Sequence, residues 1–388
     1  MSTVARVDVL TADLPFRFSF GHALASHSST TNVYVRLVLD DGTVGHGEGV
    51  PREFVTGETV ATAVDALSRV LVPAITGLEV TRPEDVPGAF EAALDRAGPD
   101  GQGPTPGARC ALELAFLDAY GRHFGRSVST WLGGHPAPVV QYDAVIPFAG
   151  PRKLAAVALA IRLAGIPRVK FKVGDGLERD LRSLAVLRRI LGPAVQLRVD
   201  ANAAWSAEEA ITAITRMRRY GVRAVEQPVP ADDLDGLRQV TAAVPEAIIV
   251  DESLRTVDEA DVLARTRACD SFNIRVSKCG GLLNARRIAE VAIAHGLAYG
   301  VGAQVGESAI LSAAGRHLAA SLPAPSHLEG SAGRLLLRED LSLDNVIPGR
   351  RGRAQTFTGP GLGIEVHEPR LREYARVVST HHPAGNGR

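Results

Sequence analysis

Three acidic residues end three successive apolar runs of the sequence. Asp200 ends QLRVD, Glu226 ends RAVE, and Asp251 follows IIV. If these runs are neighbouring barrel strands, the three carboxylates meet, and their repulsion raises their pKa values unless a cation lies among them. Oxygen ligands suit Mg²⁺, with Mn²⁺ as an alternative, and no His or Cys joins them to favour zinc. We therefore predict a metal site at these acids; otherwise each acid would be a helix cap or a solvated loop residue.

Lysine is rare in this chain and is concentrated in the same kind of apolar run. Of the 43 Lys and Arg residues, only four are lysines. Lys170 and Lys172 are two residues apart in VKFKV, so on a strand they face the same side, and Lys278 ends SFNIRVSK. Arginine keeps its proton because its pKa lies above about 12. Lysines retained in an arginine-rich chain therefore indicate positions where a proton moves.

Two adjacent lysines can make one of them a base at neutral pH. A second cation about 4 Å away lowers the pKa of a lysine by about three units, which would bring Lys172 near 7 with Lys170 and the metal as the cause. A carboxylate substrate between Lys172 and Lys278 would lose its α-proton, and the metal would stabilise the enolate. We therefore predict Mg²⁺-dependent proton abstraction with all three lysines as catalytic residues. The alternative is that Lys170 and Lys172 form buried ion pairs with strand carboxylates.

A repeated structural unit must position these residues. From about residue 139 the sequence has eight short β-rich runs, each followed by an amphipathic stretch, and the polar residues that end successive runs are 25 to 29 residues apart from Lys172 to Glu307. That period is one strand–helix unit, so we predict an α/β fold with a barrel whose carboxyl strand ends form the active site. An open doubly wound sheet would carry a Gly-x-Gly-x-x-Gly loop after its first strand, and this sequence lacks one there.

The residues before the repeat predict a second, smaller unit. Residues 4–14 read as a strand, and the Asp41-Gly42 turn in TTNVYVRLVLDDGTVGHGEG predicts a hairpin. Helical spacing of apolar residues runs over 56–77 and 108–123. Together these elements predict a small α+β domain.

The amino-acid composition indicates which kinds of molecule the protein binds. The 43 basic residues balance 43 acidic ones, so the net charge gives no argument for nucleic acid or an anionic membrane as partner. Three cysteines without a Cys-x-x-Cys pair fit a reducing compartment. The sequence shows no basic leader with an apolar core and no run of about 18 apolar residues. We expect a cytoplasmic protein that acts on a small molecule.

The motifs resemble the enolase superfamily, and within it the muconate lactonizing enzyme subgroup of the mandelate racemase/muconate lactonizing enzyme family. The resemblance covers nearly the whole chain and rests on five motifs in order: VKFKV, VDANAAW, VEQP, VDES and SKCGG. It implies a modified TIM barrel of (β/α)7β type over residues 136–330 and an N-terminal α+β capping domain over 1–135. It also implies a C-terminal segment over 331–388 that returns to the cap, and we expect disorder beyond about Val378.

The resemblance implies roles for the residues named above. The three acids would bind Mg²⁺, the second lysine of the pair and Lys278 would be the acid/base catalysts, and Lys170 would assist. Asn202 of VDANAAW, Glu307 of VGES and Glu329 are expected to contact the substrate. Glu307 could instead orient Lys278 or cap a helix.

Family members share these residues and catalyse different reactions. Dipeptide epimerases typically carry Asp-x-Asp at the eighth strand to hold the substrate ammonium, whereas His327-Leu328-Glu329 here replaces one acid with His. We therefore expect an isomerase or lyase most like a muconate-type cycloisomerase. N-acylamino acid racemase or dipeptide epimerase is the alternative, ahead of an o-succinylbenzoate synthase-like dehydratase or a non-catalytic binding barrel. Two cap loops, around Phe16–His27 and Val50–Glu58, would select the small carboxylate substrate, and we expect a homo-oligomer.

Overall fold

An antiparallel sheet forms the N-terminal part of the molecule. The computed structural model describes residues 1–22, 25–98, 105–133, 136–323 and 325–383. The sheet has the order β14-β1-β2-β3, and β4 also pairs with β1. Its strands are β1 (Ser2–His22), β2 (Ala25–Leu39), β3 (Val44–Gly49), β4 (Glu79–Val80) and β14 (Ala375–His381). The predicted turn joins β2 to β3, where Gly42 has φ +86°, a conformation that glycine adopts without a Cβ penalty.

Helices pack on this sheet and complete an α+β unit, which we call the cap. Its helices are α1 (Glu53–Thr56), α2 (Val60–Ala66), η1 (Leu67–Leu71), α3 (Val72–Ile75), η2 (Pro83–Asp85), α4 (Val86–Arg96), α5 (Pro106–His123) and η4 (Val128–Trp131). The helix α5 lies directly on β3, because a Cβ at Gly45, Gly47 or Gly49 would come within 2.3 Å of the α5 backbone. This close approach buries α5 on nearly all sides.

Seven parallel strands and a short eighth segment form a barrel. The strands are β6 (Ala144–Ile146), β7 (Arg168–Lys172), β8 (Gln196–Asp200), β9 (Val222–Glu226), β10 (Ala247–Val250), β11 (Ser271–Arg275) and β12 (Ala298–Gly302), paired in this order. Residues 327–329 close the circle, because Glu329 N donates to Val301 O (2.8 Å) and Asp143 N donates to Leu328 O (2.8 Å). The predicted α/β fold and (β/α)7β barrel are confirmed.

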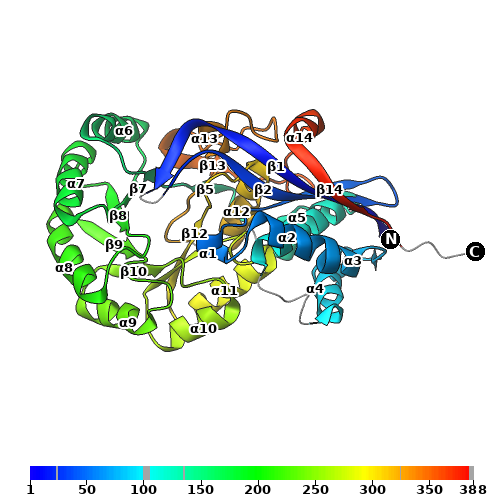
Figure 1. Cartoon of the computed structure of the whole chain (residues 1–388), viewed down its shortest axis with the longest axis horizontal. Helices are drawn as coiled ribbons and strands as arrows, with labels where there is room; N and C mark the ends of the chain where they lie inside the picture. The colour runs from blue at the N-terminus through cyan, green and yellow to red at the C-terminus, as the bar shows by residue number, and fades with distance from the viewer. Residues whose placement is uncertain (23–24, 99–104, 134–135, 324, 384–388) are drawn as a thin grey trace, which may run out of the picture.

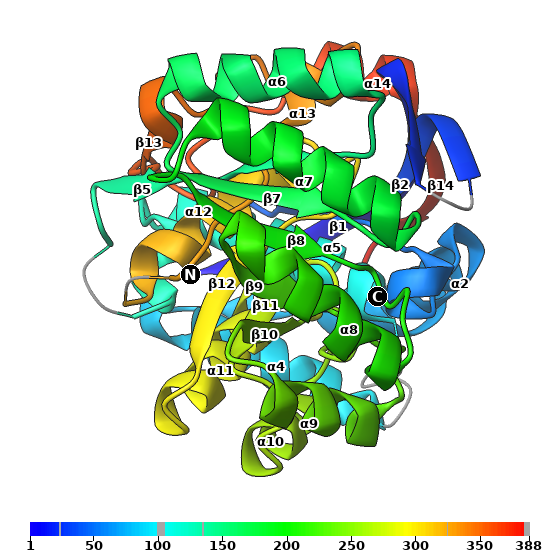
Figure 2. The same cartoon turned by 90° about the vertical axis from the view of Figure 1, so that its left-hand side faces the viewer.

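The barrel helices form an outer arc around the strands (Figures 1 and 2). They are α6 (Pro151–Ala164), α7 (Leu177–Leu191), α8 (Ala207–Met217) with η5 (Arg218–Tyr220), α9 (Leu234–Ala243), α10 (Val257–Arg265), α11 (Leu282–Ala294) and α12 (Ala309–Ser321). Capping boxes start α8 (Ser206 with Glu209) and α10 (Thr256 with Glu259), which satisfies backbone N–H groups at these helix starts. None of the described helices is long and apolar enough to span a membrane.

The C-terminal segment returns to the cap, and one prediction about it is wrong. It contains α13 (Gly333–Leu336), η6 (Arg350–Gly352), β13 (Arg353–Gln355) and α14 (Glu368–Tyr374) before β14. We predicted disorder beyond about Val378, but β14 continues to His381, which pairs with Val7 of β1. Pairing with β14 supplies partners for the backbone groups at this edge of β1. Residues 384–388 lie outside the described part of the chain.

The first predicted barrel run divides into two strands with different partners. Within VQYDAVIP, only β6 joins the barrel sheet, whereas β5 (Val139–Gln141) pairs antiparallel with β13. The C-terminal segment therefore also covers the entrance of the chain into the barrel.

Candidate active site

The strand register brings predicted lysines and acids into one row at the carboxyl end of the barrel. Lys172 on β7 pairs with Asp200 on β8, and Asp200 pairs with Glu226 on β9. Asp251 directly follows β10. The three acids have 0% exposure, so each carboxylate needs a partner within the protein.

Lys170 is a shared partner of these acids. Its Nζ lies 3.0 Å from Glu226 Oε1, 3.4 Å from Asp200 Oδ2 and 2.8 Å from Glu329 Oε2. Burial alone would lower the pKa of Lys170, but Glu226, Glu329 and Asp200 outweigh burial and raise it. Lys170 therefore keeps its proton and its positive charge. It forms the buried ion pairs with strand carboxylates that the sequence analysis gave as the alternative to a catalytic role. Asp200 lies beside both ammonium groups, 3.4 Å from Lys170 Nζ and 3.3 Å from Lys172 Nζ.

Lys172 lies at the more open side of the cluster. Its side chain is 16% exposed, compared with 3% for Lys170. Its Nζ lies 3.3 Å from Asp200 Oδ2 and donates to Asn202 Oδ1. Asn202 has φ 45°, a left-handed conformation that Asn tolerates better than most residues, and its Nδ2 donates to Glu252 Oε1 at 3.1 Å. Asn202 thus holds the amine of Lys172 in place.

Lys278 reaches the same acids from the turn after β11. Its Nζ donates to Asp251 Oδ1 at 2.8 Å, to the carbonyl of Asp251, and to the carbonyl of Asn273 at 3.2 Å. Its side chain is fully buried. The structure therefore brings all three predicted lysines into contact with the predicted acids.

Sequence reasoning missed two polar residues of β11 that contact the cluster. Arg275 donates to Asp251, and Asn273 Nδ2 donates to Glu226 Oε1 at 2.9 Å. Asn273 and Arg275 are two residues apart in a buried strand, as Lys170 and Lys172 are in VKFKV. Because alternate residues of a strand face the same side, this spacing could have identified them.

Burial raises the pKa of two carboxyl groups in the cluster, an effect that a bound cation would offset. Burial and then Asp200 raise the pKa of Glu226 to about 8, while Lys170 opposes the rise. Burial and the neighbouring Asp251 raise the pKa of Glu252 to about 7, and Glu252 Oε2 has no hydrogen-bond partner among the described residues. These carboxylate oxygens are the ligand type that Mg²⁺ prefers.

The described residues nevertheless contain no group of three or more His, Cys, Asp or Glu side chains close enough to hold a metal ion. Each predicted ligand contacts an ammonium group instead: Asp200 that of Lys172, Glu226 that of Lys170, and Asp251 that of Lys278. A divalent cation would replace these contacts. The donor chemistry fits Mg²⁺, and the metal role of the three acids stays a prediction.

The eighth strand segment contributes a buried network. Glu329 accepts from Arg198, a residue that sequence reasoning missed, as well as pairing with Lys170. Lys170 and Arg198 outweigh burial and lower the pKa of Glu329. His327 is buried with its Nε2 3.3 Å from Asn273 Oδ1, and burial followed by Arg198 lowers its pKa. Both side chains therefore have protein partners, and the predicted contact of Glu329 with the substrate remains a prediction.

Glu307 lies in the turn between β12 and α12. Its Oε1 accepts from Gln304 N at 2.7 Å, and burial raises its pKa to about 8. The side chain of Glu307 therefore stabilises this turn, and its predicted contact with the substrate remains a prediction.

The predicted cap loop over Val50–Glu58 is fastened to the rim of the barrel. Val50 N donates to Ser277 Oγ at 2.8 Å, and Val50 O accepts from Gln304 Nε2 at 3.0 Å. These contacts hold the loop between the turn that carries Lys278 and the end of β12. In the other predicted loop, around Phe16–His27, the side chains from residue 18 onward lie outside the described part.

Arg52 is a cation of this loop without an acidic partner among the described residues. Its guanidinium donates to Asn32 Oδ1 at 3.0 Å, to Thr30 Oγ1, and to two carbonyls. Burial lowers the pKa of Arg52, although the more distant Tyr34 and Glu48 oppose this. A partly buried guanidinium without an ion pair is a candidate for binding an anion.

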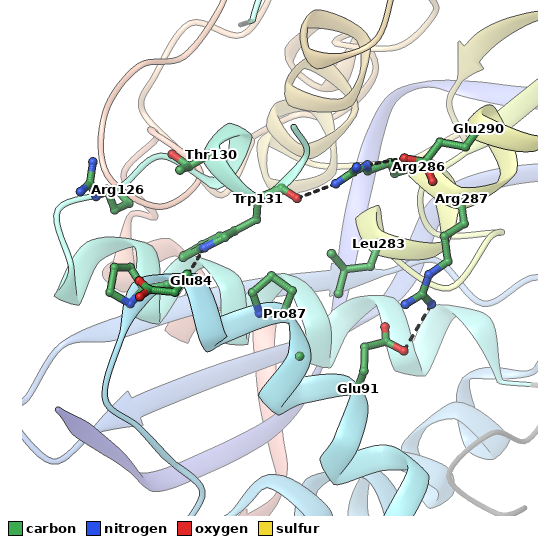
Figure 3. A pocket seen from close by; sticks show the side chains of 12 residues that line it. Glu84, Pro87, Glu91, Arg126, Thr130, Trp131, Leu283, Arg286, Arg287 and Glu290 are labelled. Atoms are coloured by element: carbon green, nitrogen blue, oxygen red, sulfur yellow. Dashed lines mark hydrogen bonds and ion pairs between the residues drawn. The ribbon is translucent and has the colours of Figure 1, made fainter. Parts of the chain in front are cut away.

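A surface hollow of about 760 Å³ lies away from this cluster, between α4, η4 and α11 (Figure 3). Its walls include Trp131, Arg286, Arg287 and Glu91, and none of the predicted lysines or acids. The buried cluster, with its perturbed titratable groups, is therefore the candidate active site.

Two family models match the chain. Residues 1–133 match the N-terminal domain of mandelate racemase/muconate lactonizing enzyme, and residues 153–370 match the model described as enolase C-terminal domain-like. Three relatives share similar identity over nearly their whole length. N-succinyl-L-Arg/Lys racemase of Bacillus cereus is 29% identical (93% of this chain, 94% of the relative), and L-Ala-D/L-Glu epimerase of Bacillus subtilis is 32% identical (93% and 96%). Muconate cycloisomerase 1-1 of Acinetobacter lwoffii is 30% identical (96% and 97%).

Similar proteins of known structure also include a racemase and a dipeptide epimerase. The N-succinyl Arg/Lys racemase structure from Bacillus cereus has a TM-score of 0.88 at 27% identity, covering 98% of this chain and 99% of the other. A dipeptide epimerase from Cytophaga hutchinsonii, complexed with Mg and D-Ala-L-Val, has a TM-score of 0.87 at 26% identity, covering 97% and 100%. The similarity therefore extends over the cap and the barrel together.

Proposed function

Because the chain belongs to the mandelate racemase/muconate lactonizing enzyme family of the enolase superfamily, we propose that it interconverts the enantiomers of an N-acylated amino acid. Its relatives are racemases, epimerases and cycloisomerases, and the chain is an isomerase or lyase. The observation that carries the proposal is the pair Lys172 and Lys278, which contact acids of one cluster from β7 and from the turn after β11. A two-base racemisation uses one acid/base group on each face of the α-carbon.

The proposed reaction moves one proton at each lysine. Lys172 Nζ takes the α-proton, the C–H electron pair passes into the substrate carboxylate, and Lys278 donates its proton to the opposite face; the reverse reaction exchanges these roles. Lys170 keeps its proton and adds fixed positive charge to the site. When bound by Asp200, Glu226 and Asp251, Mg²⁺ would stabilise the charge that develops on the substrate carboxylate.

The surroundings of the site favour an acyl group that ends in a second carboxylate. Arg52 would attract such a group at the rim, because none of the described acids forms an ion pair with it. Glu329 supports the same choice, since its ion pairs with Lys170 and Arg198 leave it unsuited to hold a free substrate ammonium. N-succinylamino acids have the required carboxylate, whereas dipeptides with a free amino terminus have an ammonium instead.

Cycloisomerisation of a dicarboxylic acid is the second candidate and was the leading expectation from the sequence. Arg52 supports it as well, because a diacid also brings a second carboxylate to the rim. Closing one lactone ring moves a single proton, whereas racemisation moves two. Because the resemblance implies that both kinds of enzyme share these lysines, the lysines alone do not rank the two candidates, and incubation in deuterated water separates them.

Incubation in deuterated water with Mg²⁺ tests the proposal. N-succinylamino acids, N-acetylamino acids, dipeptides and muconate-like diacids would be supplied separately and analysed by mass spectrometry and chiral chromatography. We expect α-deuterium and enantiomer formation with N-succinylamino acids. Cyclised product from the diacids alone would favour the second candidate, and deuterium in dipeptides alone would reject the acidic acyl group.

A further inference from the structure

Residues 276–281 carry Lys278 from β11 into α11, and this whole turn is buried. Gly280 has φ +80° and Gly281 has φ +114°, so the chain leaves the lysine through two residues in conformations that favour glycine. Glycine restricts its own φ and ψ angles less than other residues do. The position of Lys278 therefore depends on what packs against the turn.

The cap holds the turn immediately before Lys278. Ser277 is fully buried, and its Oγ accepts from Val50 N, which follows β3, at 2.8 Å. Val50 is also held at its carbonyl by Gln304 of the barrel. One end of the turn is thus attached to the cap backbone.

The cap also holds the turn immediately after Lys278, through α5. Arg109 Nη1 donates to Gly280 O at 2.6 Å. Glu113 Oε1 accepts from Leu283 N at 3.1 Å in the first turn of α11, where a helix favours negative charge. A Cβ on Gly281 would lie 2.3 Å from Glu113 Oε1, so the carboxylate is in direct contact with the turn.

Arg109 and Glu113 also stabilise each other. Arg109 Nη1 lies 3.4 Å from Glu113 Oε2, and Arg109 Nη2 lies 2.6 Å from Glu91 Oε1. Both α5 residues are buried. Arg109 and Glu113 therefore form a rigid bracket on the cap, and neither touches the acids of the active site in the described structure.

Lys172 has no corresponding attachment. Its hydrogen-bond and ion-pair partners in the described chain are Asp200 and Asn202, both of the barrel. The ammonium group of Lys278 also has its partners in the barrel, Asp251 and Asn273, but the turn that carries Lys278 is contacted by the cap at Ser277 and Gly280. The cap therefore acts on Lys278 through the backbone of its turn.

We propose that Arg109 and Glu113 are positioning residues through which the cap fixes Lys278, so that the cap controls proton transfer on one face of the substrate. The inference rests on the proposed function for the role of Lys278. Removal of Arg109 or Glu113 should displace Lys278 and leave Lys172 in place. A role in stability alone would affect both lysines equally.

A measurement without substrate tests the positioning directly. With only four lysines in the chain, lysine-selective ¹³C labelling gives four resolved side-chain sets in an NMR spectrum. In Arg109→Met we expect the Lys278 signals to move while those of Lys170 and Lys172 stay. An unmoved Lys278 signal, or equal movement of all three, would overturn the proposal.

The matched control is Arg286→Met, which removes another cap–barrel contact, the hydrogen bond that Arg286 Nη1 donates to Trp131 O at 3.1 Å (Figure 3). Arg286 shares no partner with Arg109 or Glu113 in the described structure, so we expect no lysine signal to move. If Arg109→Met does not fold, Glu113→Gln replaces it, because it removes the charge and keeps one acceptor for the α11 backbone.

Exchange with deuterated water gives the kinetic test. Lys278→Ala first identifies the enantiomer whose α-proton depends on Lys278. In Arg109→Met we expect exchange of that enantiomer to slow at least about tenfold, because small misplacements of catalytic groups cost this much or more. The other enantiomer should stay within about twofold, and Arg109→Lys should recover part of the loss.

Equal slowing of exchange for both enantiomers would contradict the proposal that the cap controls proton transfer on one face only. If the wild-type protein exchanges neither enantiomer of any N-acylamino acid, the proposed racemase function fails. The NMR comparison still decides whether the cap positions Lys278 in that case.

Discussion

Two lysines that are two residues apart on β7 have different surroundings. Lys170 is 3% exposed with three carboxylates around its amine, whereas Lys172 is 16% exposed beside Asp200 and Asn202. A cation surrounded by carboxylates holds its proton. The three carboxylates around Lys170 therefore make it a cation that keeps its proton. Lys172, with one carboxylate nearby, is the lysine proposed to exchange its proton.

Arginine at the two proton-transfer positions tests this distinction. In Lys172→Arg and in Lys278→Arg we expect α-deuterium exchange to fall at least about 10²-fold, because arginine retains its charge and cannot release a proton. Proton NMR of the substrate follows the exchange. Lys153→Arg, on the exposed face of α6, is the control and should leave the rate unchanged. Exchange near the wild-type rate in both active-site variants would contradict the two-base scheme.

Arg52 carries the prediction about substrate charge. In Arg52→Met we expect KM for an N-succinylamino acid to rise about ten- to hundredfold, because a charge-assisted hydrogen bond contributes about 1.5–3 kcal/mol. The matching N-acetylamino acid, which lacks the second carboxylate, should show little change. Steady-state kinetics on both substrates give the comparison, and an equal rise in KM for both would exclude Arg52 as the carboxylate partner.

The two ends of helix α11 differ in how closely they contact the rest of the molecule. It follows Gly281, which contacts Glu113 of the cap, and it ends before Gly296, which has φ +70° and open space around it. Both glycines adopt positive φ, but only the first faces another part of the molecule. Contact with the cap therefore restricts the start of α11 more than its end.

Alanine at these two glycines measures that restriction. Gly281→Ala should reduce the free energy of unfolding by at least about 2 kcal/mol more than Gly296→Ala does, because a Cβ would collide with Glu113 in addition to straining the backbone. Urea denaturation of both variants gives the difference. Similar losses in the two variants would show that the start of α11 can shift away from the cap.

In the whole molecule, buried cap acids join the cap to the starts of two barrel helices. Glu113 lies at the start of α11, and Glu48 of β3 accepts from Ser308 N at 3.0 Å and Leu311 N at 3.2 Å at the start of α12. Glu48 is also 0% exposed. Candidate site residues lie on the strand before α11 and in the turn before α12, so the cap and the active site share one framework.

The pH dependence of stability tests this framework. Burial raises the pKa of Glu113 to about 7, although Arg109 opposes the rise. An unfolded glutamate titrates near 4.3, so folding favours the protonated form, and this contribution is present at low pH and is lost as the pH rises through about 7. Glutamine does not titrate. We therefore expect Glu113→Gln to gain about 3 kcal/mol relative to the wild type between about pH 4 and pH 8, measured by urea denaturation. A constant difference across this range would contradict the raised pKa.

Local patterns in the sequence predicted the strand ends and the barrel. Lys172, Asp200 and Glu226 could be placed on neighbouring strands because one strand–helix unit repeats at a regular spacing. The same reasoning missed Arg275 and Asn273, since polar residues inside an apolar strand were considered only where they were lysines. It also predicted disorder beyond about Val378, where β14 continues to His381, because the pairing of β14 with β1 joins opposite ends of the chain.

The sequence by itself determined the fold class, the order of the strands and the residue types at their carboxyl ends, because these depend on spacing between near neighbours. Only the tertiary structure decided which charges neutralise each other and what holds each lysine. Glu329 meets Arg198 across 131 residues of sequence, and Glu113 meets the start of α11 across 170. No local periodicity encodes contacts at such distances, because they arise only when the barrel closes and the cap packs against it.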